Sequence, residues 1–190
     1  NCLTIFQDFI PTDEFSFQLY EEIISSKKSF EKKLNFDSKN FSFYFDEIIA
    51  LQNLINKKSF SIKVLEFGAG WGTWSIFAKS LNFDIYVNEF SINRKNFLEK
   101  NNLKIIEDLN SSEETFDLIY SNQTFEHLNY PRETFNLLYK KLNKNGLIYL
   151  KFPDSFFFKN KIKKNYIPCK DAAHPLEHIN LFNINSFLSI

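Results

Sequence analysis

The stretch that decides the fold is Val64 to Gly72, which reads VLEFGAGWG. The chain has only four glycines in 190 residues, and three of them, Gly68, Gly70 and Gly72, stand within this stretch. Glycine adopts positive φ angles without a steric penalty and lets another group approach the backbone closely. An apolar run that leads into such a turn predicts a buried strand followed by a tight, ligand-binding loop.

Around this turn the sequence alternates between strand-like and helix-like segments. Apolar runs predict strands over residues 61–67, 84–88, 103–106, 116–121 and 147–152. Helical spacing predicts three helices. The first carries Trp74, Phe77, Ala78 and Leu81, and the second spans 91–100 with Ser91 as its N-cap. The third spans about 131–143: Pro131 lies in its first turn, Gly146 lies past its end, and one face carries Phe135, Leu138 and Leu142. This alternation predicts an α/β fold with a parallel sheet, helices on both faces, and a ligand site beyond the carboxyl ends of the strands.

The segments that flank this core differ from it. Residues 1–57 form a helical N-terminal region, in which apolar side chains recur at helical spacing, and residues 58–190 form the α/β domain. Residues 153–176 contain a lysine-rich stretch together with Pro168 and Pro175, and they predict a long loop. Such a loop is either a binding loop or a solvated insertion, and the sequence leaves both open.

Composition excludes several classes of protein. Lys plus Arg equals Asp plus Glu, 23 each, so a broad electrostatic affinity for nucleic acid or for anionic membranes is not expected. No apolar run approaches the roughly 20 residues of a membrane span, and no signal-peptide pattern opens the chain. Two cysteines make no disulfide framework, so we expect a reduced, cytoplasmic protein. The sequence does not determine its oligomeric state. The chain contains no methionine and is expected to be a fragment.

Acidic residues near the glycine turn suggest what it binds. The spacing is G-x-G-x-G and not the G-x-G-x-x-G of dinucleotide sites, and Glu66 would repel a pyrophosphate but attract an ammonium or sulfonium. Glu89 ends the next strand, where a carboxylate accepts hydrogen bonds from ribose hydroxyls, and Phe90 could lie on an adenine face. Asp108 follows the third strand, near an adenine amino group, and Asn122 and Gln123 end the fourth.

The sequence resembles class I S-adenosylmethionine-dependent methyltransferases of the type 11 and type 23 groups. The resemblance covers residues 63–155 and rests on the ordered motifs VLEFGAGWG, VNEF, EDL, FDLIYSNQTFEHL and LNKNGLIYLKFPDS; it continues into HPLEHINLFN. The resemblance implies a Rossmann-like three-layer sandwich. Its parallel strands would run in the order 3-2-1-4-5, with the fifth at the edge and strands 6 and 7 of the family missing. It implies methyl transfer from S-adenosyl-L-methionine to a small-molecule acceptor, by O- or C-methylation of a sugar or a quinone-type compound.

The resemblance also implies roles for particular residues. The cofactor would contact Glu66, Phe67, Gly68, Ala69, Gly70, Gly72, Glu89, Phe90, Asp108, Leu109, Asn122 and Gln123. His178 and His127 are the candidate catalytic bases. His178 lies in a segment that would fold back over the site. His127 could instead pack behind the site without a catalytic role. Trp71 could wall the methionine end, Trp74 belongs to the core, and Asp154 either orients a substrate hydroxyl or starts a turn. No metal-ligand constellation is visible, so no catalytic metal is expected.

Three alternatives stay open at this point. An NAD-dependent oxidoreductase or epimerase would share Glu89, but the chain lacks G-x-G-x-x-G and a Tyr-x-x-x-Lys pair after the fourth strand. A non-catalytic member of the fold would keep the cofactor site alone. Residues 1–12 resemble the segment that follows a small zinc ribbon in some methyltransferases. Cys2 would then be the last zinc ligand of that ribbon; alternatively, it is a cysteine that occurs there by chance. Cys169 is expected to be chemically inert.

Overall fold

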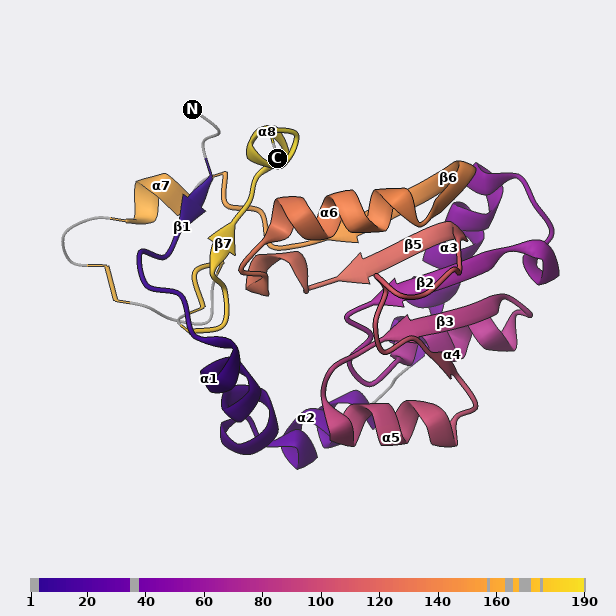
Figure 1. Ribbon diagram of the computed structural model, residues 1–190, viewed down its shortest axis with the longest axis horizontal. Helices are drawn as coiled ribbons and strands as arrows, with labels where there is room; N and C mark the ends of the chain where they lie inside the picture. The colour runs from indigo at the N-terminus through magenta and orange to yellow at the C-terminus, as the bar shows by residue number, and fades with distance from the viewer. Residues whose placement is uncertain are drawn as a thin grey trace.

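The centre of the molecule is a parallel sheet of five strands in the order β4-β3-β2-β5-β6 (Figure 1). The computed structural model describes residues 4–34, 38–156, 158–162, 166–167, 172–174 and 176–189. The strands are β2 (Lys63–Phe67), β3 (Asp84–Asn88), β4 (Lys104–Ile105), β5 (Phe116–Asn122) and β6 (Leu142–Lys151). Counted along the sheet, this is the predicted order 3-2-1-4-5, and β6 lies at the predicted edge.

Helices cover both faces of this sheet, because successive side chains of a strand point to opposite faces. Val64 of β2 joins a core cluster with residues of α3 (Ser38–Ile55), α4 (Thr73–Ser80) and α5 (Ile92–Lys100). The next residue, Leu65, joins a second cluster with Leu138 of α6 (Pro131–Lys140) and with the C-terminal segment around Phe182. The predicted three-layer α/β sandwich is therefore confirmed.

Several predicted helix signals are present at the expected places. Ser91 caps α5 by accepting a hydrogen bond from the Arg94 N–H at 3.4 Å, and Pro131 occupies the first turn of α6. Trp74 is 2% exposed and stacks on Tyr120, as expected of a core residue.

The predicted end of the helix after β5 was wrong. The helix expected over 131–143 ends at Lys140, and Leu142 begins β6 instead of lying on the helix face. Leu142 pairs with Phe116, while Leu147 pairs with Leu118, so β6 carries a bulge in which Asn145 has a φ of 64°. Strand pairing on β5 thus competes successfully with the helical pattern, and the strand starts five residues before its predicted position.

The two flanking regions meet each other outside the main sheet. β1 (Ile5–Phe6) pairs in antiparallel fashion with β7 (Asn180–Leu181), and Figure 1 shows this pair beside the carboxyl end of β5. The remaining helical elements are α1 (Asp13–Gln18), the π-helix η1 (Leu19–Ile23), α2 (Ser26–Leu34), the single 3-10 turns η2 (Ser59–Ser61) and η3 (Phe125–His127), α7 (Phe158–Lys161) and α8 (Ile184–Phe187). Helices were predicted for residues 13–56, whereas the β1–β7 pair was not. Cys2 and Cys169 lie outside the described residues.

No helix in the described part of the chain is long and apolar enough to span a bilayer.

Candidate functional site

The three glycines of the turn all have positive φ angles, but they serve different neighbours. A Cβ on Gly68 would lie 2.3 Å from Thr124 Oγ1, and one on Gly72 would lie 2.2 Å from Leu98 Cδ2. A Cβ on Gly70 would meet no protein atom within 4 Å, although its φ is +58°. Gly68 and Gly72 therefore allow the turn to pack against the protein, while Gly70 faces open space that a ligand could fill.

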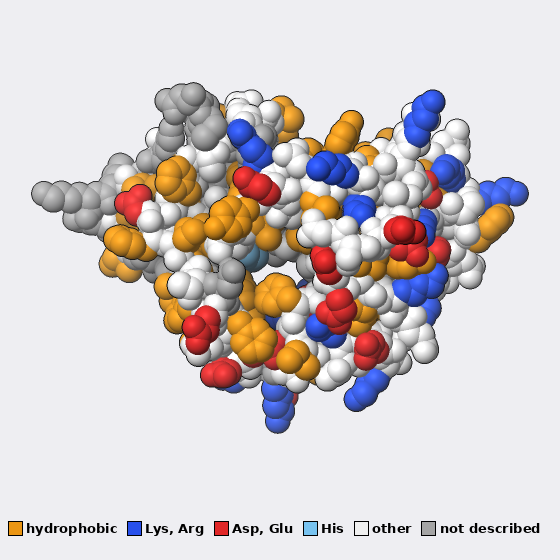
Figure 2. All heavy atoms as spheres, in the orientation of Figure 1, with side chains coloured by type: hydrophobic (Ala, Val, Ile, Leu, Met, Phe, Trp, Pro, Cys, Tyr) orange, Lys and Arg blue, Asp and Glu red, His pale blue; other side chains and the backbone are white. Residues whose placement is uncertain are grey.

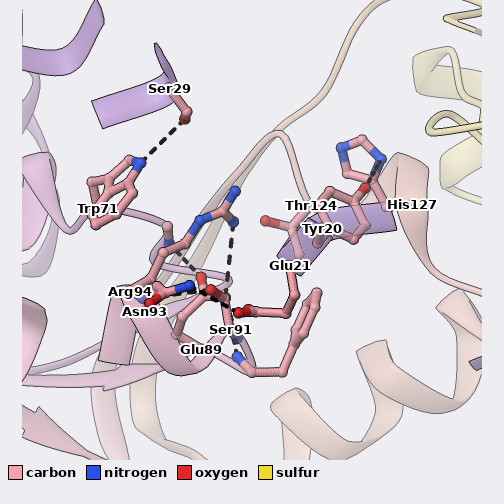
Figure 3. A network of polar contacts seen from close by, with 12 residues as sticks. Tyr20, Glu21, Ser29, Trp71, Glu89, Ser91, Asn93, Arg94, Thr124 and His127 are labelled. Carbon is pink, nitrogen blue, oxygen red and sulfur yellow. Dashed lines mark hydrogen bonds and ion pairs between the residues drawn. The ribbon is translucent and has the colours of Figure 1, made fainter. Parts of the chain in front are cut away.

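The Glu89 carboxylate holds this turn in place. It is 4% exposed and accepts hydrogen bonds from the backbone N–H of Gly70 at 2.6 Å, of Phe90 at 3.1 Å and of Ser91 at 3.0 Å (Figure 3). The Arg94 guanidinium approaches it at 3.9 Å. An ionised carboxylate offers about four acceptor positions, so capacity for a ligand hydroxyl remains.

Glu66, the acidic residue that precedes the glycines, is buried behind the turn. One of its oxygens accepts hydrogen bonds from both the backbone N–H and the hydroxyl of Ser75 at the start of α4. Burial raises the pKa of this carboxyl to about 8, against the opposing effect of the Ser75 hydrogen bonds. A cation placed beside Glu66 would favour its ionised form.

Two cavities meet at the glycine turn. The larger, about 600 Å³, opens between the N-terminal helices and the carboxyl ends of the strands, and the smaller, about 190 Å³, lies under α2. Figure 2 shows a hollow at the centre of the viewed face, with hydrophobic side chains around it. Both cavities are lined by Gly68, Arg94 and Gln123.

Most of the predicted cofactor residues line these cavities. The larger contains Gly68, Glu89, Phe90 and Gln123, and the smaller contains Glu66, Gly68, Ala69, Gly70, Asn122 and Gln123. Trp71 also lines the smaller cavity. That it walls the methionine end of the cofactor stays a prediction.

Four predicted cofactor residues do not line either cavity. The side chains of Phe67 and Leu109 belong to the second core cluster, and Gly72 packs against Leu98. The exposed Asp108 carboxylate accepts a hydrogen bond from the Asn110 backbone N–H at 2.8 Å, which lowers its pKa and stabilises a turn. These positions were expected from sequence spacing, but core packing and turn chemistry account for them here. Asp154 likewise accepts from the Phe156 N–H at 2.9 Å and starts a turn.

All three histidines of the chain gather at one side of the larger cavity. The rings of His127 and His178 lie 4.9 Å apart, and those of His174 and His178 lie 5.6 Å apart. His127 lines the cavity, whereas His178, which was expected to be the better base, stands behind it. Tyr20 of η1 reaches His127 through its hydroxyl at 3.2 Å, as Figure 3 shows.

The protonation of two of these rings follows from their partners. His127 Nδ1 lies 2.6 Å from the Glu177 carbonyl oxygen, and His178 Nδ1 lies 2.9 Å from the Ala172 carbonyl oxygen. A carbonyl oxygen only accepts, so Nδ1 carries the hydrogen in both rings and Nε2 carries the lone pair of the neutral form. Burial lowers the pKa of His127 to about 4, so this ring is a neutral acceptor at pH 7.

The comparisons with known proteins agree with this geometry. The family model described as "Methyltransferase domain" matches residues 36–190. The chain belongs to this methyltransferase family. No curated protein matches the sequence.

Solved structures of methyltransferases share the fold. The plantazolicin methyltransferase BpumL in complex with SAH is similar with a TM-score of 0.61 and 16% identity, over 91% of this chain and 70% of that one. Coclaurine N-methyltransferase bound to N-methylheliamine and SAH is similar with a TM-score of 0.56 and 19% identity, over 77% of this chain. The chain spans about half of that enzyme's length, 47%. The glycopeptide N-methyltransferase MtfA has a TM-score of 0.50 and 16% identity, over 60% of this chain and 55% of its own.

A buried acid, Glu126, lies beside the histidines. Glu126 is 1% exposed, and neither of its carboxylate oxygens has a hydrogen-bond partner among the described residues. Burial raises its pKa to about 7. With His127 and His178 it forms a group whose potential ligand atoms lie within 4.8 Å of one another.

This group would have to contract to hold a metal ion. Ligand atoms about 2.1 Å from a tetrahedral zinc lie about 3.4 Å apart, whereas Glu126 Oε1 and His127 Nε2 are 4.0 Å apart. That no catalytic metal takes part stays a prediction.

Sequence reasoning missed several residues that line the two cavities, among them Tyr20, Lys33, Tyr44, Arg94 and Thr124. Arg94 is one of only two arginines in the chain and follows Glu89 by five positions, a signal that could have been used. Tyr20 and Lys33 belong to helices that were predicted, but nothing in their local spacing indicates that these helices cover the strand ends.

Proposed function

We propose that the chain binds S-adenosylmethionine at the glycine turn and transfers its methyl group to a small-molecule acceptor in the larger cavity. The observation that carries this proposal is Gly70. Its backbone N–H is held by Glu89, and the space beside its α-carbon is empty of protein. Such a cradle lies beyond the carboxyl ends of parallel strands, where this class of sheet binds its ligands.

The chemistry of the surrounding groups fits this cofactor. Glu66 and Glu89 supply negative charge and acceptors toward an ammonium, a sulfonium and the ribose hydroxyls. Phe90 is 56% exposed and lines the larger cavity, so its ring can lie against an adenine. When bound, the cofactor supplies a methyl group that is already electrophilic, and the protein must mainly align the acceptor with it.

The histidine cluster supports a base on the acceptor side. Attack of an acceptor hydroxyl oxygen on the methyl carbon forms the O–C bond, breaks the C–S bond and releases a proton. His127 Nε2 takes that proton, because His127 lines the cavity and its Nδ1 is already hydrogen-bonded to a carbonyl. His178 is a second acceptor of protons behind it.

The walls of the larger cavity favour an aromatic acceptor. Phe17, Tyr20, Phe90, Leu128 and Tyr130 all line it. Aromatic side chains bury large apolar areas and pack well against flat apolar molecules. Of the acceptor types that the sequence implies, a phenol or quinol is therefore favoured over a sugar, with O-methylation as the reaction.

The proposal is tested by titration calorimetry with S-adenosylhomocysteine and with NAD. We expect a dissociation constant in the micromolar range for the former, about −8 kcal/mol, and no heat from NAD. Binding of NAD alone would identify the oxidoreductase alternative. Labelled S-adenosylmethionine with a panel of phenols and sugars then measures transfer, and tight cofactor binding without transfer would indicate a non-catalytic member.

A further inference from the structure

The larger cavity is bordered by a hydroxyl group whose hydrogen finds no acceptor among the described residues. Tyr20 of η1 lines this cavity, and its oxygen lies 3.2 Å from His127 Nδ1. That nitrogen carries the hydrogen that the Glu177 carbonyl oxygen accepts at 2.6 Å, so it has no lone pair to offer. The Tyr20 oxygen can therefore only accept from His127, and its own hydrogen remains for a ligand.

The Tyr20 side chain is held in position from the opposite wall of the cavity. Its ring meets the Phe90 ring edge-on with 5.7 Å between centroids, and the Arg94 guanidinium lies 5.9 Å from its centroid. Next to it on η1, Glu21 accepts a hydrogen bond from the Asn93 side chain at 3.1 Å (Figure 3). π-Helical turns such as η1 are rare and are found frequently at functional sites. These contacts fix where the hydroxyl oxygen lies.

The Tyr20 hydroxyl is suited to binding and not to proton transfer. Burial raises the pKa of Tyr20 well above its ordinary value, and the Glu177 carboxylate acts in the same direction. The group is therefore a neutral donor at pH 7, distinct from the base at His127. Two threonines that line the same cavity, Thr124 and Thr134, donate their hydroxyl hydrogens to backbone carbonyls instead.

We propose that the Tyr20 hydroxyl selects acceptors that carry a second oxygen on the carbon next to the reacting hydroxyl. This inference rests on the proposed function, because it names the kind of phenol that the same cavity takes. The reacting hydroxyl would face His127 Nε2, and the neighbouring oxygen would accept a hydrogen bond from Tyr20, which lies against the other nitrogen of that imidazole. Oxygens on adjacent ring carbons suit two groups arranged around one imidazole ring. A phenol that lacks the second oxygen leaves the Tyr20 donor unpaired, and a site of this kind discriminates against it.

The test compares two phenols of matched shape as methyl acceptors. Catechol has the second oxygen, whereas ortho-methylphenol has a methyl group in its place. Tyr20→Phe keeps the ring against Phe90 and removes only the hydroxyl. It should lower the ratio of kcat/KM for catechol to that for ortho-methylphenol about 5- to 100-fold, which corresponds to about 1–3 kcal/mol. Intrinsic differences in reactivity cancel when the ratio is compared between variant and parent. Tyr139→Phe, at an exposed position on α6, should keep the ratio of the parent.

The same assay contains the results that would overturn the inference. A merely structural role of Tyr20 would lower kcat/KM for both phenols alike and leave their ratio unchanged. A larger change in the ratio of resorcinol to meta-methylphenol would place the second oxygen two carbons away. Either result would leave the proposed function in place. A parent chain that binds S-adenosylhomocysteine but transfers methyl groups to none of these phenols would overturn the phenol acceptor of the proposed function itself. Circular dichroism shows that Tyr20→Phe is folded.

Discussion

The two sides of the site are built in different ways. The glycine turn of the cofactor side, with Glu66, Gly70 and Glu89, comes from one continuous strand–turn–helix–strand stretch, and the hydrogen bonds of these two carboxylates join residues at most 19 positions apart. The acceptor side joins Tyr20 to His127 across 107 positions and His127 to Glu177 across 50. A local motif can therefore specify the first side, whereas the second exists only when the chain's two flanking regions fold onto the sheet.

The largest expected effect separates the two sides by function. His127→Ala should lower kcat by about 100- to 10,000-fold, the usual contribution of a general base, because no neutral imidazole then borders the cavity. The dissociation constant of S-adenosylhomocysteine should change less than about twofold, since the described hydrogen bonds and ring contact of His127 are with Tyr20, Glu177 and His178 and not with the glycine turn. Steady-state kinetics and calorimetry measure the two quantities.

His174→Ala is the matched control for this comparison, because His174 pairs with Glu177 at 2.9 Å and does not line the cavity. It should retain most of the activity. Comparable losses of activity in both variants would show that the cluster acts through packing and not through proton transfer at His127.

The second prediction compares two glycines within the cofactor side. Gly70→Val should weaken S-adenosylhomocysteine by more than about 100-fold, because the side chain would fill the open cradle. Gly72→Val has a similar positive φ, but its side chain would collide with Leu98, so its main effect should be on the melting temperature. Thermal melts and binding titrations on both variants distinguish a ligand cradle from a packing requirement. Normal binding by Gly70→Val would mean that the cofactor lies elsewhere.

The third prediction uses pH to test the buried acid beside the histidines. The Glu126 pKa is raised from its ordinary 4.5 to about 7, so the folded chain holds the proton more tightly than the unfolded chain. The stabilisation is complete below about pH 4.5 and is lost as pH rises through 7. The difference of 2.5 units corresponds to about 3 kcal/mol at most.

Glu126→Gln removes this ionisation. Its advantage in free energy of unfolding over the parent should therefore grow between pH 5 and pH 8, as measured by urea unfolding. Glu133→Gln, at an exposed position on α6, should follow the pH dependence of the parent. A constant difference between Glu126→Gln and the parent would show that Glu126 keeps its charge on folding, through a partner such as a bound cation.

The contrast between the two sides also explains what sequence could predict. The cap at Ser91, the first-turn position of Pro131 and the conformation of the glycine turn follow from local patterns, and the strand order follows from the family resemblance. The structure confirms all four. The end of α6 was missed because Leu142 fits a helix face as well as a strand, and only its pairing with Phe116 decides between them.

Turn chemistry and long-range packing decided the remaining site residues. Asp108 was expected at an adenine because acids follow strands in such sites, but Asn110 offers its carboxylate a nearer partner. His127 and His178 were named from the sequence, yet which of them borders the cavity depends on how the C-terminal segment and η1 pack around them. Lys33 could not be found, since no local pattern shows that α2 covers the turn.

The smallest expected effect concerns the contact that holds this cover. Ser29→Ala removes the hydrogen bond from Trp71 Nε1, while the Trp71 ring keeps its packing against Phe30 and Phe97. A neutral hydrogen bond contributes about 0.5–1.5 kcal/mol, so S-adenosylhomocysteine should bind about 2- to 10-fold more weakly, mainly through faster dissociation as α2 opens more often. Stopped-flow tryptophan fluorescence measures that rate, and Ser80→Ala, on the exposed side of α4, should leave it unchanged.

Because the contact lies wholly on the cofactor side, Ser29→Ala should also leave the KM of the acceptor unaltered. An acceptor KM that rises with the dissociation rate would instead show that α2 couples the two sides, and the division between them would no longer hold.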